Sequence, residues 1–134
     1  MNTASQEKPQ MLVVDDESCI RLLLARVFGG TFQVTRAASV DEGMTQLAEG
    51  APSVILMDVN MPGKDGIQGL HEVRAIDPFV PVIIMTGSIL AMEGESLLQQ
   101  GADAFVTKPF DVVELIRIVT QLTAVSETKP AVLS

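Results

Sequence analysis

Short apolar runs alternate with longer amphipathic stretches along this chain. The runs are strand-sized, are bounded by polar or turn-forming residues, and occur at Met11–Val14, Phe32–Ala37, Ser53–Met57, Val80–Met85 and Ala104–Val106. Continuous apolar runs of this length are typical of strands that are buried on both faces. The pattern therefore predicts five buried strands.

Between these runs, apolar residues recur at the spacing of three and four that is typical of a helix. Ser39 and Glu42 have the spacing of a capping box, Asp111 is placed to cap the last helix, and Gly50 and Gly101 follow two of the others. The predicted helices are Ile20–Phe28, Val40–Leu47, Ile67–Ile76, Leu90–Gln100 and Val112–Leu122.

A strand followed by a helix, repeated five times, predicts an α/β fold with a parallel sheet covered by helices on both faces. We expect one domain over residues 10–123, because the polar stretch 1–9 reads as a flexible arm and residues 124–134 as a tail or linker without a helical face. In such sheets, ligands bind beyond the carboxyl ends of the strands.

Composition narrows the possible chemistry. The net charge of −8 over 134 residues argues against direct contact with nucleic acid or an anionic membrane. A single Cys and a single His exclude an internal disulfide framework and a zinc-finger-type site. No stretch has the length of a membrane span, and the amino terminus lacks the apolar region of a signal peptide, so we expect a cytoplasmic protein.

Polar side chains stand at the predicted carboxyl ends of four strands. Asp15 and Asp16 follow the first strand, Asp58 the third, Thr86 the fourth and Lys108 the fifth. Taken singly, an Asp in these places is often an ordinary helix cap or turn residue. Their shared position at one edge of the sheet favours a functional site instead.

Three clustered carboxylates need a counter-charge, since two unit charges about 4 Å apart repel by roughly 4 kcal/mol at an effective dielectric near 20. Oxygen ligands without Cys or His suit Mg²⁺, with Mn²⁺ as the alternative ion. A metal ion, the Lys108 ammonium and the Thr86 hydroxyl facing a central carboxylate would together suit a phosphoryl group. Carboxylates are known nucleophiles in aspartyl-phosphate chemistry.

Four motifs at these positions resemble the receiver domain of two-component response regulators, of which the single-domain chemotaxis regulator is the minimal case. They are LVVDDE (Leu12–Glu17), ILMDVNMPGKDG (Ile55–Gly66), IIMTG (Ile83–Gly87) and GADAFVTKPF (Gly101–Phe110). The resemblance runs from about Gln10 to Leu122 and implies a flavodoxin-like fold with strand order 2-1-3-4-5.

The resemblance also implies a role for each site residue. Asp58 would be the phosphoacceptor, and Mg²⁺ would be held by Asp15, Asp16, Asp58 and the main-chain carbonyl of Asn60. Lys108 would contact the phosphoryl oxygens, and its peptide bond to Pro109 would be cis. Thr86 and Phe105 would be the switch residues; Phe105 lacks the hydroxyl of the Tyr often found there.

These roles imply a phosphorylation-dependent signalling switch and not an enzyme. The only reactions that it would catalyse are its own phosphorylation and its slow autodephosphorylation. The expected phosphodonor is a histidine kinase or histidine phosphotransfer protein. The expected output is a changed face of the fourth helix, fifth strand and fifth helix, which acts on a downstream protein or output domain or forms a homodimer through the fourth and fifth helices. Direct nucleic-acid or membrane contact by this domain is not expected.

Two other functions use similar residues or a similar fold. A hydrolase of the haloacid-dehalogenase kind also has an Asp nucleophile, but it needs a second acid two residues later, where this chain has Asn60, and its acidic pair follows the nucleophile. Flavin or dinucleotide binding needs a phosphate-binding loop after the first strand, where this chain has acidic residues. Outside the motifs, we expect Cys19 to pack in the core and His71 to face solvent.

Overall fold

The computed structural model of this chain describes residues 8–87 and 91–128, in which strands and helices alternate throughout. The strands are β1 (Gln10–Val14), β2 (Gln33–Ala37), β3 (Val54–Asp58), β4 (Val82–Thr86) and β5 (Ala104–Thr107). The helices are α1 (Ser18–Phe28), α2 (Val40–Glu49), α3 (Gly66–Ile76), α4 (Ala91–Gln99) and α5 (Val112–Thr128). All ten predicted elements are present; Leu90, the predicted start of the fourth helix, lies outside the described residues.

The sheet is parallel throughout, in the order β2-β1-β3-β4-β5. The predicted fold and the strand order implied by the resemblance are thus confirmed. The central strands β3 and β4 are buried at every position, whereas the edge strands β2 and β5 are not. Because β1, β3 and β4 are neighbours, their carboxyl ends meet at the middle of one sheet edge.

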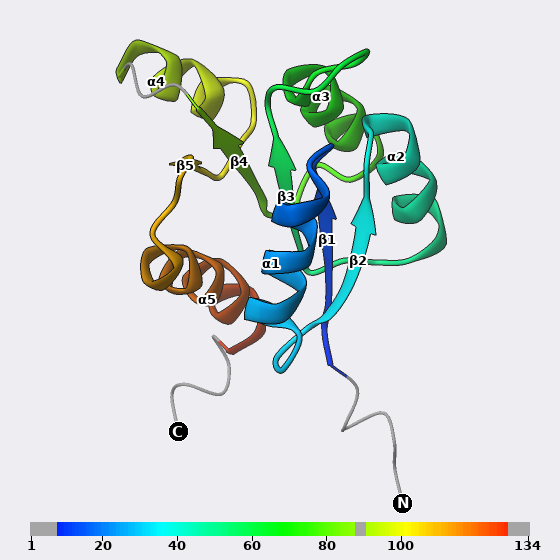
Figure 1. Ribbon diagram of the computed structural model, residues 1–134, viewed down its shortest axis with the longest axis vertical. Helices are drawn as coiled ribbons and strands as arrows, with labels where there is room; N and C mark the ends of the chain where they lie inside the picture. The colour runs from blue at the N-terminus through cyan, green and yellow to red at the C-terminus, as the bar shows by residue number, and fades with distance from the viewer. Residues whose placement is uncertain (1–7, 88–90, 129–134) are drawn as a thin grey trace, which may run out of the picture.

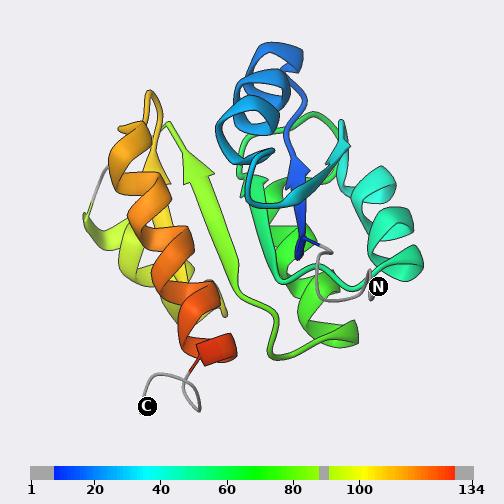
Figure 2. The ribbon, with the colours of Figure 1, turned by 90° about the horizontal axis from the view of Figure 1, so that it is seen from below.

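Helices cover both faces of this sheet, with α1 and α5 on one side and α2 and α3 on the other (Figure 1). Figure 2 shows the same layers from below. Side chains of β1 alternate between the two cores: Met11 and Val13 pack with α1 and α5, while Leu12 and Val14 join the other cluster. A strand buried on both faces needs apolar residues at every position, which explains the continuous runs in the sequence.

Side-chain caps fix where several helices begin. Ser39 Oγ accepts the Glu42 N–H at 3.1 Å, as the capping-box spacing predicts, although the Glu42 carboxylate accepts the N–H of Ala38 rather than that of Ser39. Asp65 and Gln68 form a complete capping box at the start of α3, which we did not predict. Asp111 Oδ1 accepts backbone N–H groups at the start of α5, as predicted.

The last helix differs from the prediction. α5 runs to Thr128, past the predicted end at Leu122, so the first part of the predicted tail 124–134 is helical. No Gly or Pro occurs between Leu122 and Thr128, and Pro130 is the first helix-breaking residue. At 17 residues α5 is still short for a bilayer, and in the described part of the chain no helix has the length and apolarity to cross a membrane.

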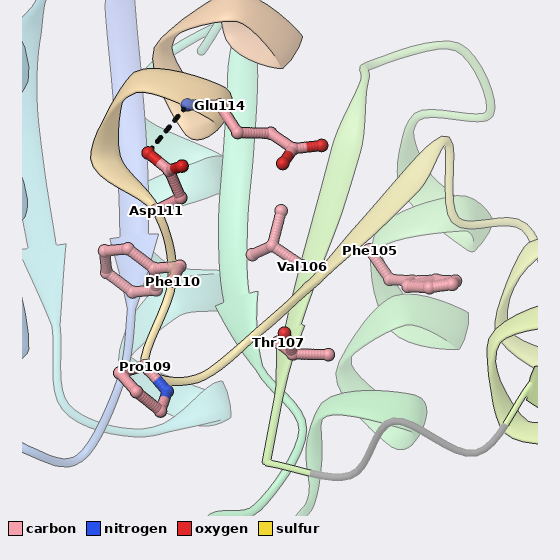
Figure 3. Close-up of a pocket in the computed structure, with 7 residues that line it drawn as sticks. All are labelled: Phe105, Val106, Thr107, Pro109, Phe110, Asp111 and Glu114. Atoms are coloured by element: carbon pink, nitrogen blue, oxygen red, sulfur yellow. Dashed lines mark hydrogen bonds between the residues drawn. The ribbon is translucent and has the colours of Figure 1, made fainter.

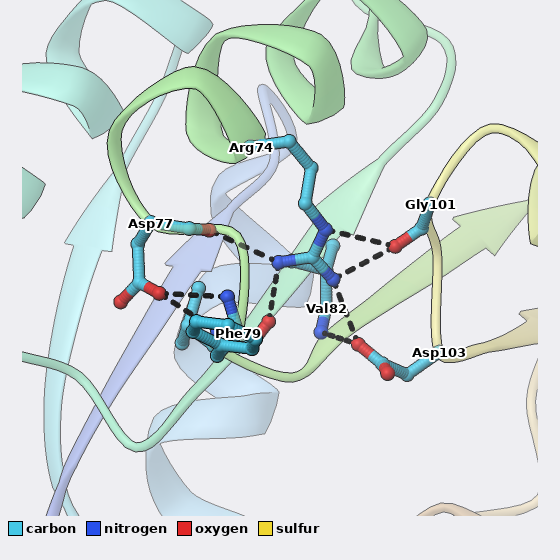
Figure 4. A network of polar contacts seen from close by, with 7 residues as sticks. Arg74, Asp77, Phe79, Val82, Gly101 and Asp103 are labelled. Atoms are coloured by element: carbon cyan, nitrogen blue, oxygen red, sulfur yellow. Dashed lines mark hydrogen bonds and ion pairs between the residues drawn. The ribbon is translucent and has the colours of Figure 1, made fainter.

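Arg74 ties the end of α3 to the loops that precede β4 and β5 (Figure 4). Its guanidinium donates to the Gly101 carbonyl at 3.0 and 2.7 Å and to the Val80 carbonyl at 2.6 Å, and it pairs with Asp103 at 2.8 Å. Gly101 has a φ of +117°, a conformation that favours glycine. This network holds the start of β5, and with it the strand that presents Lys108.

Candidate functional site

The fold brings the predicted strand-end residues to one edge of the sheet. Asp15 directly follows β1, Asp58 and Thr86 end β3 and β4, and Lys108 directly follows β5. The Lys108 side chain reaches across that edge, and its Nζ lies 2.7 Å from Asp15 Oδ2 and 3.4 Å from Asp58 Oδ1. The parallel order of the strands is what makes this contact between residues far apart in sequence.

Three carboxylates form a compact oxygen cluster beside that lysine. One carboxylate oxygen from each of Asp15, Asp16 and Asp58 lies within 4.8 Å of the others. Asp15 is fully buried and Asp58 is 3% exposed, whereas Asp16 is exposed. An all-oxygen set of this kind, open on the side of Asp16, fits Mg²⁺, which takes carboxylates together with water and phosphoryl oxygens.

Backbone groups hold the two buried carboxylates in place. Asp15 Oδ1 accepts the Glu17 N–H at 2.9 Å, and the Asp15 carbonyl accepts Arg21 Nη1 at 2.8 Å. Asp58 Oδ1 accepts the Asn60 N–H at 3.3 Å. The loop after β3 therefore steers the Asp58 carboxylate through a main-chain donor of Asn60.

Burial and neighbouring charges shift the pKa values of both Asp58 and Lys108. Burial raises the pKa of the Asp58 carboxyl above its ordinary value and the charge of Asp15 raises it further, while the Asn60 N–H and Lys108 oppose the rise. Burial alone would lower the pKa of Lys108, but the hydrogen bond to Asp15 and the charges of Asp15 and Asp58 outweigh it, so this pKa is raised. Lys108 is thus a firmly protonated cation beside a carboxylate whose charge is costly.

A hollow of about 260 Å³ opens over these groups and is lined by Asp16, Glu17, Asp58, Asn60, Gly87 and Lys108. Glu17 is the lining residue that the sequence reasoning did not single out. The signal that could have found it is its place directly after the acidic pair, at the first turn beyond β1. The hollow has the polar lining and the cation that a phosphoryl group requires.

The residues expected to switch lie next to this pocket rather than within its lining. Thr86 is 7% exposed at the end of β4, and its carbonyl accepts the Lys108 N–H at 2.7 Å. Phe105 is half-buried on β5, opposite Ile84 of β4. The peptide bond between Lys108 and Pro109 is cis, as the resemblance implies.

A second hollow, of about 310 Å³, lies along β5 and the start of α5 (Figure 3). Phe105 and Phe110 point to opposite sides of this segment, and they pack against the two opposite cores of the sheet. The segment that carries Lys108 is therefore anchored on both faces of the sheet.

Two residues set aside by the sequence reasoning have different outcomes. His71 is exposed on α3, as predicted. The prediction that Cys19 packs in the core is wrong, because Cys19 lies on the exposed side of the first turn of α1. The core-facing positions of that helix are Leu24 and Phe28.

Known proteins resemble this chain over most of its length. The family model "Response regulator receiver domain" matches residues 11–120. The chain is 39% identical over 108 residues to the DNA-binding transcriptional regulator NtrC of Salmonella typhimurium, a match that covers 80% of this chain and 23% of that protein. It is 36% identical over 111 residues to the uncharacterized transcriptional regulatory protein YkoG of Bacillus subtilis, covering 82% of this chain and 49% of the relative. The chain thus spans less than half the length of these relatives.

Solved structures agree with this match. The receiver domain of the Francisella response regulator 1452 superposes with a TM-score of 0.84 at 30% identity, covering 90% of this chain and 100% of that one. A CheY-like receiver domain protein from Methanospirillum hungatei JF-1 shares the fold with a TM-score of 0.84 at 22% identity, over 92% of this chain and 99% of that one. Because the family model matches most of the chain and its members share this architecture, the protein belongs to the response regulator receiver domains, the phosphoacceptor signalling domains of two-component systems.

Proposed function

We propose that Asp58 is the residue that accepts the phosphoryl group. A carboxylate oxygen of Asp58 attacks the phosphorus of a phosphohistidine; the new P–O bond forms as the P–N bond breaks, and the electron pair of that bond stays on the imidazole nitrogen. The observation that carries this proposal is the position of Lys108 Nζ, 3.4 Å from Asp58 Oδ1 and 2.7 Å from Asp15 Oδ2. From there the ammonium can neutralise charge on the phosphoryl oxygens as they reach Asp58.

Asp15, Asp16, Asp58 and the main-chain carbonyl of Asn60 are the groups that would hold Mg²⁺, and Mn²⁺ suits the same oxygen ligands. When bound, the ion supplies charge neutralisation for the cluster and for the phosphoryl oxygens. The compact arrangement of the three carboxylate oxygens supports this assignment. Asp15 and Asp58, both buried, would orient the site, while the exposed Asp16 leaves it open to water.

We expect the same pocket to release the phosphoryl group slowly by hydrolysis. Water attacks the phosphorus, the P–O bond to Asp58 breaks, and inorganic phosphate leaves. Phosphorylation and this hydrolysis are the only reactions that we assign to the domain. Its output is therefore its own phosphorylated form and not a small-molecule product.

We propose that this state is read through Thr86 and Phe105. The Thr86 hydroxyl would bond the phosphoryl group, and Phe105 would turn inward beside it. The face that changes would be formed by α4, β5 and α5, where Leu98, Val113 and Ile116 are exposed apolar side chains suited to a partner or a second copy. Dimerisation through α4 and α5 is one form that this output can take.

The family indicates which classes of protein act as partners of this domain. Response regulators receive their signal from histidine kinases, so we propose a kinase or a histidine phosphotransfer protein as the donor, acting in the cytoplasm. The Salmonella relative is a DNA-binding regulator of which this chain matches less than a quarter. With a net charge of −8, we expect this domain to leave any contact with DNA to a partner or output domain.

Intact-protein mass spectrometry tests the proposal. The wild-type chain is incubated with acetyl phosphate and Mg²⁺, alongside Asp58→Asn and the matched surface variant Asp41→Asn. We expect the mass of one phosphoryl group on the wild-type chain and on Asp41→Asn and none on Asp58→Asn. An equal gain in Asp58→Asn, or no gain in any of the three, would overturn the proposal.

A further inference from the structure

Glu17 occupies the N-cap position of α1 without capping the helix. Its backbone is extended, with φ −90° and ψ 119°, but its side chain makes no cap hydrogen bond. Ser, Thr, Asp and Asn are the residues preferred at such positions, because their shorter side chains reach the free N–H groups of the first turn. The glutamate instead lines the acidic pocket, with Oε1 3.5 Å from Lys108 Nζ.

Three carboxylates therefore surround one ammonium, and they differ in freedom. Asp15 and Asp58 are buried, and backbone N–H groups hold them. The Glu17 side chain is 58% exposed, while that of Lys108 is 17% exposed. Glu17 is thus the solvent-exposed partner of an ammonium whose other two partners are buried and hydrogen-bonded to the backbone.

We propose that Glu17 is a positioning residue that draws the Lys108 ammonium toward the mouth of the pocket and competes with an incoming phosphoryl group for it. This inference rests on the proposed phosphorylation of Asp58. A phosphodonor must take Lys108 away from Glu17 before it gains the full attraction of the cation. Glu17 then sets the donor concentration at which phosphorylation is half-saturated, while the rate of attack by Asp58 on the bound donor is unchanged.

Two variants separate this contact from a general charge effect. Glu17→Gln keeps the length of the side chain and removes its charge. Glu17→Asp keeps the charge, but the shorter side chain can cap α1 and so leave Lys108. Glu49→Gln, on the exposed end of α2, is the matched control for loss of one negative charge.

The test is the initial rate of phosphorylation by acetyl phosphate with saturating Mg²⁺, measured across donor concentration, together with the melting temperature. We expect Glu17→Gln to lower the half-saturating donor concentration by about 2- to 5-fold, the fold-change that corresponds to one solvent-exposed ion pair. Glu17→Asp should shift it in the same direction while raising the melting temperature. Maximal rates should stay close to that of the wild type, and Glu49→Gln should match the wild type throughout.

Two results would overturn the inference while the proposed function stands. One is that all Glu17 variants take up phosphoryl groups with the wild-type donor dependence. The other is that Glu17→Gln shifts this dependence but Glu17→Asp does not, which would assign the effect to overall charge rather than to the Lys108 contact. If the wild-type chain takes up no phosphoryl group, the proposed function fails and this inference with it.

Discussion

At the scale of single residues, the site is a compromise between burial and charge. Asp58 is 3% exposed, and its neighbours include a second buried carboxylate, Asp15. A buried carboxylate is costly to keep ionised, and Lys108 offsets that cost only in part, since the pKa of Asp58 stays raised. The folded domain therefore gives up some stability at neutral pH to keep a charged carboxylate at position 58.

This compromise predicts how Asp58→Asn changes stability with pH. Because the pKa of Asp58 is raised in the folded state, the stability linked to it is complete below about pH 4, the unfolded value, and is lost as pH rises through the folded value. The neutral Asn side chain avoids that loss. Without metal, we expect Asp58→Asn to melt at a higher temperature than the wild type at pH 7, and the gap to shrink below about pH 4.

Thermal unfolding over a series of pH values measures this gap, with the acidic end of the series as its internal control. A variant that is less stable than the wild type at pH 7, or a gap that does not change with pH, would contradict the account of Asp58.

Single residues also show what the sequence could and could not predict. Asp15, Asp58 and Lys108 were found because strand ends are readable from apolar runs, and a parallel sheet gathers those ends at one edge. The contact of Glu17 with Lys108 was missed, since it depends on where one long side chain turns at a helix start. The burial of Cys19 was predicted wrongly for a similar reason. The apolar pattern shows which face of the helix is buried, but not whether a residue of the first turn at the edge of that face is covered.

At the scale of elements, the start of α3 is packed directly against the end of β3. A Cβ atom on Gly66 would lie 2.7 Å from the Val59 Cα and still closer to the Asp58 carbonyl oxygen. Both neighbours are backbone atoms, so no side-chain rotation can relieve the contact. Gly66 thus allows a helix to begin directly against the backbone of Asp58 and Val59.

We expect Gly66→Ala to lower the free energy of unfolding by about 1–3 kcal/mol, the usual cost of overpacking. Gly30→Ala is the control, because a Cβ there meets nothing within 4 Å and its φ lies outside the left-handed region. Urea unfolding of both variants measures the difference. Equal stability of Gly66→Ala and Gly30→Ala would contradict the packing described here.

The helices and strands also show which features of the fold the sequence pattern can predict and which it cannot. The number, type and order of helices and strands could be predicted, since apolar periodicity and glycine stops agree along the chain. The length of α5 could not, because residues after Leu122 neither break a helix nor form a clear apolar face. The Arg74 network could not be predicted either, because four of its five hydrogen bonds go to backbone carbonyl groups that come together only in the folded chain.

At the scale of the whole molecule, an acidic chain concentrates negative charge where a cation is needed. The cluster of Asp15, Asp16 and Asp58 predicts that Mg²⁺ stabilises the folded protein, by about 2.7 kcal/mol when the ion is at 100 times its dissociation constant. Asp16→Asn should reduce this gain, and because Asp16 is exposed we expect the variant to fold like the wild type.

The shift in melting temperature on adding Mg²⁺ measures this gain, and Glu49→Gln is again the matched control for charge. If Asp16→Asn and Glu49→Gln gain as much from Mg²⁺ as the wild type, the ion binds outside the strand-end cluster.

The central claim is that the phosphoryl group is carried by Asp58. The most direct measurement is borohydride reduction of the acyl phosphate after incubation with acetyl phosphate and Mg²⁺, followed by peptide mass spectrometry, because reduction converts a phosphorylated aspartate to homoserine. We predict homoserine at position 58 and at no other aspartate. Homoserine at position 15 or 16, or its absence from a chain that has gained a phosphoryl group, would contradict the account.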